Sequence, residues 1–353
     1  MTLAFQPGDT DLLIPRPEPA EAAALHPYTV HTHYFGFTVP EAEIGAFLYA
    51  RYMPAFGLSQ GGPVIFRGLD NVSPLDVEYH DYRATMPWPS VEGNTIRFDC
   101  GYEIDFVKPG ELVRLRYESA DGEAGFELEQ RAVTPLVARG HVVPGEEAHH
   151  GGSGLAHGGS EQFMHCTGEL RLRGETYAVD CHAVRDRSWN QVRSEEPGGA
   201  QPSPPVGWSP AWFGDDLAFN ATGIESPDSD PAWLGLFDVP PGAPTSYYKW
   251  LVRHGELVEI TAVRRNVVEY HPVLHSAVRQ ELELVEAGGR VHRFEGRAIA
   301  VAPVYAWPNV AFRDSVHRWE DEQGRVTHCT YQEIFWDRYQ RRMRGRKGDL
   351  RRG

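Results

Sequence analysis

The chain has 353 residues, of which 41% are hydrophobic and 24% charged, and its formal net charge is -15. This length exceeds the roughly 250–300 residues that usually fold around a single hydrophobic core, so we expect two domains. The negative charge argues against a general nucleic-acid binder, which needs clustered lysine and arginine. No apolar run approaches the roughly 18 residues of a membrane span. Glycine (36) and proline (27) are frequent, which favours many turns over long helices.

The N-terminal 26 residues are acidic and rich in proline. They contain no basic start followed by an apolar run, so we expect an extended segment and no signal peptide. A zinc knuckle or a dense disulfide framework is not indicated, since no C-x-x-C pair occurs among the four cysteines, Cys100, Cys166, Cys181 and Cys329. These features predict a cytoplasmic protein.

Alternation of apolar and polar residues is the main pattern along the chain. Residues 40–51 fit a short amphipathic helix and a strand equally well, and both interpretations stay open. From 98 to 106 every second residue is apolar, which predicts one half-buried strand. After turns at Pro109-Gly110 and Asp121-Gly122 the alternation resumes at 113–117 and 126–128. These runs predict an antiparallel meander.

The second half repeats this pattern. Residues 170–172 lead through Gly174 to 177–181, and residues 278–284 lead through Gly288-Gly289 to 291–294. Further strands are expected at 217–224, 247–252, 257–263 and 328–336. Sequential hairpins close most simply into up-and-down barrels, which removes exposed edges. We therefore predict an all-β fold of two tandem antiparallel barrels with few short helices.

Two stretches predict loops: 141–160 is rich in glycine and histidine, and 194–210 is rich in proline. We place the domain boundary near residue 155. The predicted organisation is an extended segment (1–26), an N-terminal barrel domain (27–155), a C-terminal barrel domain (156–337) and a basic tail (338–353). The tail carries seven arginines and one lysine, and a partly disordered terminus is favoured there over a membrane or RNA contact.

The segment richest in chemically active side chains is 182–193, with one carboxylate, three guanidinium groups, an indole and two amides. Asp186 lies between Arg185 and Arg187. Such an aspartate can be held ionised as a structural pair, or it can act as an acid if apolar walls desolvate it strongly enough. Local chemistry favours the structural clasp over catalysis.

Two histidines lie on the strands that lead towards Asp186. His165 is nine residues before Gly174 and His182 is eight after it, so a turn at Gly174 would bring the two rings together. The histidines in the glycine-rich stretch lack zinc-type spacing, and we predict no metal site. Neither a phosphate loop nor a G-x-S-x-G elbow occurs, so we expect no nucleotide cofactor and no serine hydrolase.

The run RDRSWN, preceded by EQFMHCTGELRLRGETYAVD, resembles the G-x-x-RD-H/R-SW-G-x-R signature of the carotenoid 1,2-hydratase (hydroxyneurosporene synthase) superfamily, which includes kievitone-hydratase-like proteins. Residues 31–54 and 317–336 are similar to the opening strands and the closing hairpin of such proteins. The resemblance implies two lipocalin-like barrels. It also implies addition or removal of water across a carbon-carbon double bond, with Asp186 protonating the alkene beside Trp189. Asn190 stands where glycine is usual, and Cys181-His182-Ala183 replaces the common small lead-in.

We therefore expect a cofactor-independent lyase, of the hydratase or dehydratase type, that acts on a hydrophobic terpenoid or aromatic small molecule. The expected catalytic residues are Asp186, His182 and His165. The expected substrate-binding residues are Trp189, Arg185, Arg187, Tyr34, Trp88 and Trp212. Two alternatives stay open, a non-catalytic lipocalin-like carrier and a carbon-carbon lyase on a plant-derived aromatic. Apart from the hydrophobic ligand we expect no nucleic acid and no stable membrane insertion, and a homodimer is possible.

Overall fold

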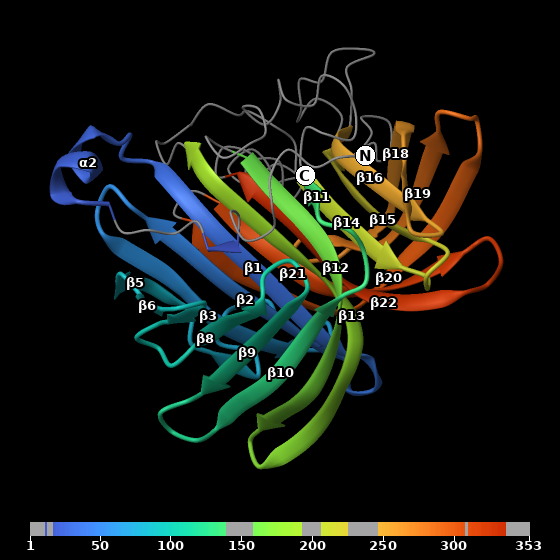
Figure 1. Cartoon of the computed structure of the whole chain (residues 1–353). Helices are drawn as coiled ribbons and strands as arrows, with labels where there is room; N and C mark the ends of the chain where they lie inside the picture. Colours follow the sequence, from blue (N-terminus) through green and yellow to red (C-terminus); the bar gives the residue numbers. More distant parts are fainter. Residues whose placement is uncertain are drawn as a thin grey trace, which may run out of the picture.

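A computed structural model describes residues 11–12, 17–138, 158–192, 206–224, 246–307 and 310–336. Strands make up most of these ranges (Figure 1), which confirms the predicted all-β class. Short helical pieces include α2 (Pro19–Ala24), within the segment predicted to be extended, and the 3-10 turn η1 (Pro40–Ala42). No helix in the described ranges is both long and apolar enough to cross a bilayer.

The first sheet is built from thirteen strands within these ranges. They are β1 (Thr29–Val39), β2 (Ile44–Met53), β3 (Leu58–Arg67), β4 (Tyr79–His80), β5 (Arg83–Pro87), β6 (Ser90–Glu92), β7 (Thr95–Arg97), β8 (Glu103–Lys108), β9 (Leu112–Glu118), β10 (Ala124–Ala132), β11 (Val137–Ala138), β12 (Gly158–Leu172) and β13 (Glu175–Val192). The order across the sheet is β4-β3-β2-β1-β13-β12-β10-β9-β8-β7-β6, with β5 paired to β3 and β11 to β12.

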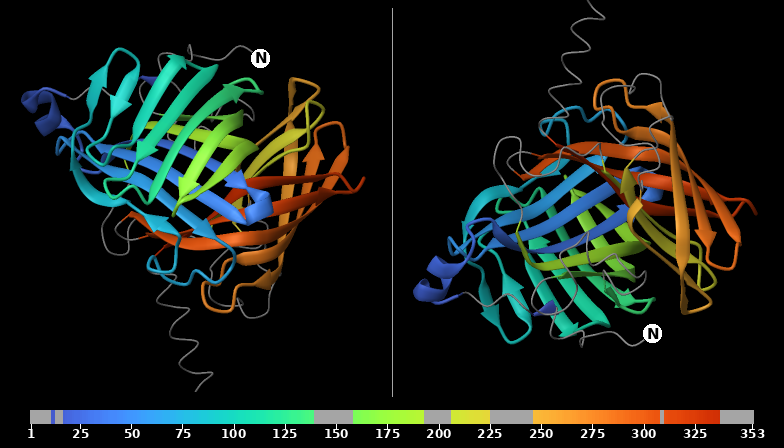
Figure 2. Two further views of the ribbon diagram at one scale, coloured as in Figure 1. Left: turned by 90° about the horizontal axis from the view of Figure 1, so that it is seen from below. Right: turned by 90° about the horizontal axis from the view of Figure 1, so that it is seen from above.

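The second sheet has nine strands in the described part of the chain. They are β14 (Val206–Trp212), β15 (Ala218–Ile224), β16 (Ser246–Arg253), β17 (Glu256–Val258), β18 (Ile260–Tyr270), β19 (Ala277–Glu286), β20 (Val291–Trp307), β21 (Val310–Asp321) and β22 (Val326–Trp336). Their order is β17-β16-β15-β14-β22-β21-β20-β19-β18. Both sheets are antiparallel and strongly curled (Figure 2), and β16 and β18 approach each other to bring the second sheet close to closure. This is the predicted architecture of two barrels.

Several predicted boundaries differ from the observed ones. The predicted strand 98–106 begins only at Glu103, because residues 98–101 form a tight turn in which Gly101 has a φ of 89° and its N–H donates to the Phe98 carbonyl. The segment 40–51, open between helix and strand, is the turn η1 followed by β2. The predicted loop 194–210 overlaps β14, which begins at Val206, and residues 193–205 lie outside the described ranges.

The chain passes from one sheet to the other between β13 and β14. The predicted domain boundary near residue 155 falls in 139–157, outside the described residues, and stays a prediction. The basic tail also lies outside them.

The hairpin β12–β13 is the longest in the first sheet. Arg173 and Gly174 connect the two strands with φ angles of 50° and 84°. Two consecutive residues with positive φ define the type I′ turn, whose twist matches that of antiparallel strands. This turn fixes the register of the hairpin, so that Cys166 faces Cys181 and Glu161 faces Asp186. All four cysteines are buried and free.

The two sheets pack face to face. Figure 2 shows β1–β3, in blue, lying against β20–β22, in orange and red, and β13 also contacts β22. Glycine allows the close approach: a Cβ on Gly45 would stand 2.6 Å from both the Phe66 ring and a methyl group of Val316. One core cluster therefore fills the first barrel, and a second fills the other barrel together with the space between the sheets.

Candidate functional site

The two faces of β13 point into different compartments, because successive side chains of a strand alternate. Ala183, Arg185 and Arg187 share the face that includes Cys181, which belongs to the core of the first barrel. Val184 belongs to the cluster between the sheets, and Asp186 shares its face. The RDR motif is thus divided between two environments, with the arginines on one side and the aspartate on the other.

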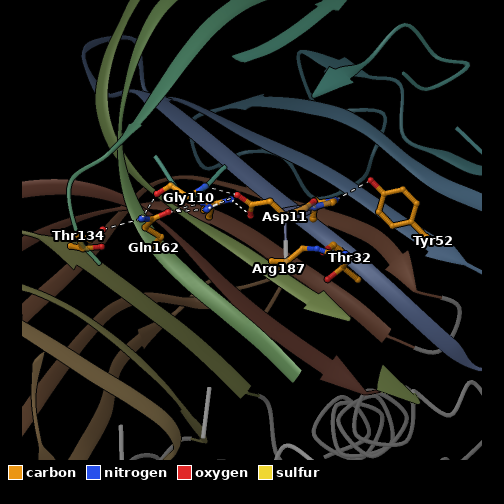
Figure 3. A network of polar contacts seen from close by, with 9 residues as sticks. Asp11, Thr32, Tyr52, Gly110, Thr134, Gln162 and Arg187 are labelled. Atoms are coloured by element: carbon orange, nitrogen blue, oxygen red, sulfur yellow. Dashed lines mark hydrogen bonds and ion pairs between the residues drawn. The ribbon is translucent and has the colours of Figure 1, made fainter. Parts of the chain in front are cut away.

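Arg185 is held in a closed polar network, and Figure 3 labels its partners Asp11 and Gln162 and the neighbouring Gly110. Its Nη1 lies 2.7 Å from Asp11 Oδ1, and its Nη2 lies 2.8 Å from Gln162 Oε1. The second Asp11 oxygen accepts the Gly110 backbone N–H at 2.7 Å. The two ionic side chains are 3% and 0% exposed. The expected Arg-Asp clasp therefore exists, but its aspartate is Asp11 and not Asp186, and Arg185 does not face the same compartment as Asp186.

Arg187 faces the same compartment as Arg185. Its Nη1 donates to the Thr32 carbonyl at 2.9 Å and to the Ser188 carbonyl. Complete burial lowers its pKa to about 10, so it is charged at neutral pH. Burial and the Arg187 charge in turn lower the pKa of His31 to about 3, and that of His33 well below its ordinary value. Both imidazoles are therefore neutral and serve as hydrogen-bonding groups.

On the opposite face, three functional side chains form a row across adjacent strands. Glu161 of β12 pairs in register with Asp186, and Asp186 pairs with Tyr34 of β1. Register partners on one face lie about 5 Å apart. Glu161 and Tyr34 are almost completely buried, whereas Asp186 is half-buried. A molecule that reaches this row from solvent can therefore meet Asp186.

Glu161 is fixed by three donors from the second sheet. Trp208 Nε1 donates to Oε1 at 3.0 Å, Trp250 Nε1 donates to Oε2 at 2.7 Å, and the Asn220 amide also donates to Oε2. Indole and amide N–H groups can only donate, so both oxygens act as acceptors, as in an ionised carboxylate. These bonds hold Glu161 in place and join the two sheets.

A second row, on the second sheet, faces the first. Trp208 pairs in register with Gln332, and Gln332 pairs with Asp314. The Trp208 ring lies edge-on to Tyr34, with centroids 5.4 Å apart. Asp314 is 0% exposed, and burial raises its pKa well above the ordinary value. Burial, with the nearby Asp314 next in importance, also raises the pKa of Tyr34. We call these residues, Glu161, Asp186, Tyr34, Trp208, Gln332 and Asp314, the inter-sheet site.

The two predicted histidines lie further along the same face. His165 and His182 are register partners whose rings stack at 4.9 Å, which confirms the expected proximity. His182 also stacks on Trp212 at 5.1 Å. Burial, with a smaller contribution from His165, lowers the pKa of His182 to about 4. Four residues of strand separate His182 from Asp186, about 13 Å, so the imidazole is beyond hydrogen-bond reach of that carboxylate.

Two further predicted binding residues lie elsewhere. Trp88 packs on Tyr52 in the first barrel, with ring centroids 5.8 Å apart, and does not face the inter-sheet site. Trp189 is fully buried, two residues beyond Arg187. No three His, Cys, Asp or Glu side chains in the described ranges gather as metal ligands would, and His149, His150 and His157 lie outside those ranges.

Comparison with known proteins identifies a family. The sequence profile described as "Domain of unknown function (DUF7064)" matches residues 19–335. The chain belongs to this family. No curated protein matches it. Among solved structures it is similar to kievitone hydratase from Nectria haematococca, with a TM-score of 0.46 and 12% identity over 94% of this chain and 96% of that one. It is also similar to CghA, solved with Sch210972, with a TM-score of 0.45 and 12% identity over 87% and 88% of the two chains.

The DUF7064 family carries no assigned activity in its description, so the chemistry of the chain has to be argued from its own residues. The resemblance of RDRSWN to carotenoid 1,2-hydratases in particular is not tested by these matches and stays a prediction.

Sequence reasoning missed most of the residues that form or support the inter-sheet site: Glu161, Asn220, Trp250, Asp314 and Gln332 were not expected there. Only Glu161 had a usable signal. The turn at Gly174 that places His165 beside His182 also places Glu161 beside Asp186, because both pairs lie in the same register. The other four residues belong to the second sheet. Their local sequence does not show which strands of the second sheet face the first sheet.

Proposed function

We propose that this chain is a cofactor-independent lyase that adds water to, or removes it from, a hydrophobic small molecule at the inter-sheet site. Asp186 is the group that exchanges a proton with the substrate. The observation that carries the proposal is the pair of rows. Asp186 lies between Glu161 and Tyr34 in the first row, and the second row, with Gln332 and Asp314, meets the first through Trp208, which contacts both Tyr34 and Glu161.

Acid/base catalysis needs groups in one compartment that differ in pKa, so that some keep a proton while others release it. Burial keeps Asp314 and Tyr34 neutral by raising the pKa of each, so each keeps a proton that it can donate to a ligand. Glu161 accepts from three N–H groups. Asp186 is the carboxyl group of the set with access to solvent. This division suits Asp186 to proton exchange and the other groups to orientation.

The walls of the site suit an apolar substrate. Tyr34, Trp208 and Phe47 are buried, and the Tyr34 ring contacts both of the others. Aromatic faces attract positive charge and shelter reactive intermediates from water. The arginines of the RDR motif face the first barrel instead, so an anionic substrate would find no partner in them.

The test is Asp186→Asn, assayed on a panel of hydrophobic terpenoid and aromatic alkenes and alcohols by mass spectrometry for gain or loss of one water. We expect the wild type to convert at least one compound, and the variant to lose about 100-fold or more of that rate. The stability of the variant should stay within about 1 kcal/mol of wild type.

A matched control lies on the same strand: Asp180 is 78% exposed and pairs with His165, so Asp180→Asn should keep full activity. Full activity in Asp186→Asn would overturn the proposal. A wild-type protein that binds these compounds and releases all of them unchanged would do so as well, and would point to the carrier.

A further inference from the structure

Four polar side chains between the two sheets have no hydrogen-bond partner among the described residues. They are the Tyr34 hydroxyl, both Asp314 oxygens, the Gln332 amide nitrogen and the Thr330 hydroxyl. Each residue is at least nine-tenths buried, with exposed fractions of 3%, 0%, 8% and 0%. Buried polar groups are nearly always paired, so a group of unpaired ones at one place requires an explanation.

These groups converge from both sheets. Asp314 and Gln332 are register partners, and Thr330 is two residues before Gln332 on the same face. The Tyr34 hydroxyl and the Thr330 methyl lie 2.8 and 3.0 Å from the point where a Cβ on Gly36 would stand. Asp314, Thr330 and Gln332 are all near enough to influence the titration of Tyr34. The four side chains with unpaired groups therefore lie close together beside Gly36.

Together these groups form a set of hydrogen-bond donors. The pKa values of Asp314 and Tyr34 are both raised by burial, so each carries a proton at neutral pH and can donate it in a hydrogen bond. The Gln332 amide nitrogen can only donate. Three neutral donors that lie together in a buried place match an oxygen that gains negative charge during a reaction.

We propose that Tyr34, Asp314 and Gln332 form a seat for a carbonyl oxygen, so that the substrate is a β-hydroxy ketone or the matching enone, not an unactivated alkene. This inference rests on the proposed function and names its substrate class. Asp186 is next to Tyr34 across the strands, so a molecule with its carbonyl in the seat presents its adjacent carbon towards Asp186.

The step balances without a further reactant. In dehydration Asp186 takes a proton from the carbon adjacent to the carbonyl, and the electron pair of that C–H bond moves towards the carbonyl oxygen, where the three donors stabilise the enolate. The pair then returns to form the carbon-carbon double bond as the bond to the β-hydroxyl group breaks. Asp186 gives its proton to the departing hydroxide, which leaves as water. Hydration is the reverse.

The test uses benzylideneacetone labelled with carbon-13 at the carbonyl, and an analogue that has a methylene group in place of the carbonyl. We expect the wild type to bind the ketone more tightly than the analogue and to lower its carbonyl stretching frequency. Tyr34→Phe removes one donor and keeps the ring. It should weaken ketone binding about five- to tenfold, reverse part of the frequency shift and leave binding of the analogue unchanged.

Asp314→Leu is the second variant, because replacing an unpaired buried acid by an apolar residue of similar size does not remove a native hydrogen bond. It should show the same selective loss. Equal affinity of the wild type for the ketone and the analogue would overturn the seat. A bound carbonyl frequency that is the same in both variants as in the wild type would overturn it as well. Ordered water would then be the occupant.

Proton exchange separates this inference from the proposed function. In deuterated water the wild type should exchange hydrogen at the carbon between the carbonyl and hydroxyl carbons of the β-hydroxy ketone faster than buffer does, and Asp186→Asn should not. Loss of ketone binding in Tyr34→Phe without any exchange in the wild type would keep the seat and refute the lyase. Exchange that is unaffected by Tyr34→Phe and Asp314→Leu would keep the lyase and refute the seat.

Discussion

The two faces of the first sheet differ in how completely some buried polar groups are paired. On the face towards the first barrel, Arg185 is bonded to Asp11 and Gln162, and Asp11 is bonded to Gly110. On the face towards the second sheet, the Tyr34 hydroxyl lacks a hydrogen-bond partner in the described ranges, and so do the Asp314 oxygens of the second sheet, although both residues are equally buried. The same sheet thus has a closed network on one side and unpaired groups on the other.

The comparison separates structural from chemical roles. A closed network has no donor or acceptor left for a ligand, so its members contribute to stability. An open network costs free energy in the folded state, because desolvated groups have lost water without gaining a partner. Substitutions on the closed face should therefore change stability, and substitutions of the unpaired groups should change binding and activity.

The largest change in stability is expected from Arg185→Met. It leaves the Asp11 carboxylate buried without its cation, which typically costs about 3–5 kcal/mol. Urea unfolding followed by tryptophan fluorescence measures the loss. Arg171 of β12 is the control, since its side chain is 54% exposed in an ion pair with Glu118, and Arg171→Met should change stability little. Similar losses in the two variants would mean that the network does not hold the first barrel.

A smaller effect is expected from Trp250→Phe, because Glu161 is the member of the inter-sheet site that is fully bonded. The variant removes the 2.7 Å donor to Glu161 and reduces the size of the ring. Trp319 is also fully buried, but its indole nitrogen has no partner in the described ranges, so Trp319→Phe reduces the ring alone. We expect Trp250→Phe to cost about 1.5–3 kcal/mol more than Trp319→Phe in urea unfolding. Equal costs would contradict the role given to Glu161.

The smallest effect concerns pH and the closed face. His31 accepts the Asn190 N–H at its Nδ1 and has a pKa of about 3 in the folded chain, against 6.5 when unfolded. Between these values the unfolded chain binds more protons, so stability is complete above about pH 6.5 and falls as the pH falls towards 3. At pH 5.5 the loss due to His31 is about 1.4 kcal/mol relative to pH 8. His31→Gln should reduce the pH dependence of unfolding by that amount, and an unchanged dependence would show that His31 is not neutral by burial.

The fold was predictable from sequence because strand alternation and turn residues are local signals. The hairpin at Gly174 was placed correctly since its two central residues set both the turn type and the register. The strand expected from residue 98 failed because Asp99 to Gly101 keep the alternation while they turn the chain. A periodic pattern records which side chains are buried, and a tight turn can bury them as well as a strand does.

The site was only partly predictable. Asp186 and Tyr34 were identified as candidates, and they are register partners. The partner of Arg185 could not be predicted, because Asp11 reaches it from a segment 174 residues away in sequence. Asp314 gave no signal either, since a single aspartate in an alternating strand usually faces solvent. Which strands of the second sheet meet β1 and β13 depends on how two curled surfaces dock, and local sequence does not encode this.

The glycines at the contact between the sheets have a further consequence. A Cβ at Gly36 would stand 3.0 Å from a methyl carbon of Thr330, and a Cβ at Gly45 would stand 2.6 Å from a methyl carbon of Val316, both on the second sheet. Any larger residue at either position would therefore push the two layers apart. The contact between Tyr34 and Trp208 would then be lost, so these glycines decide whether the two halves of the inter-sheet site meet.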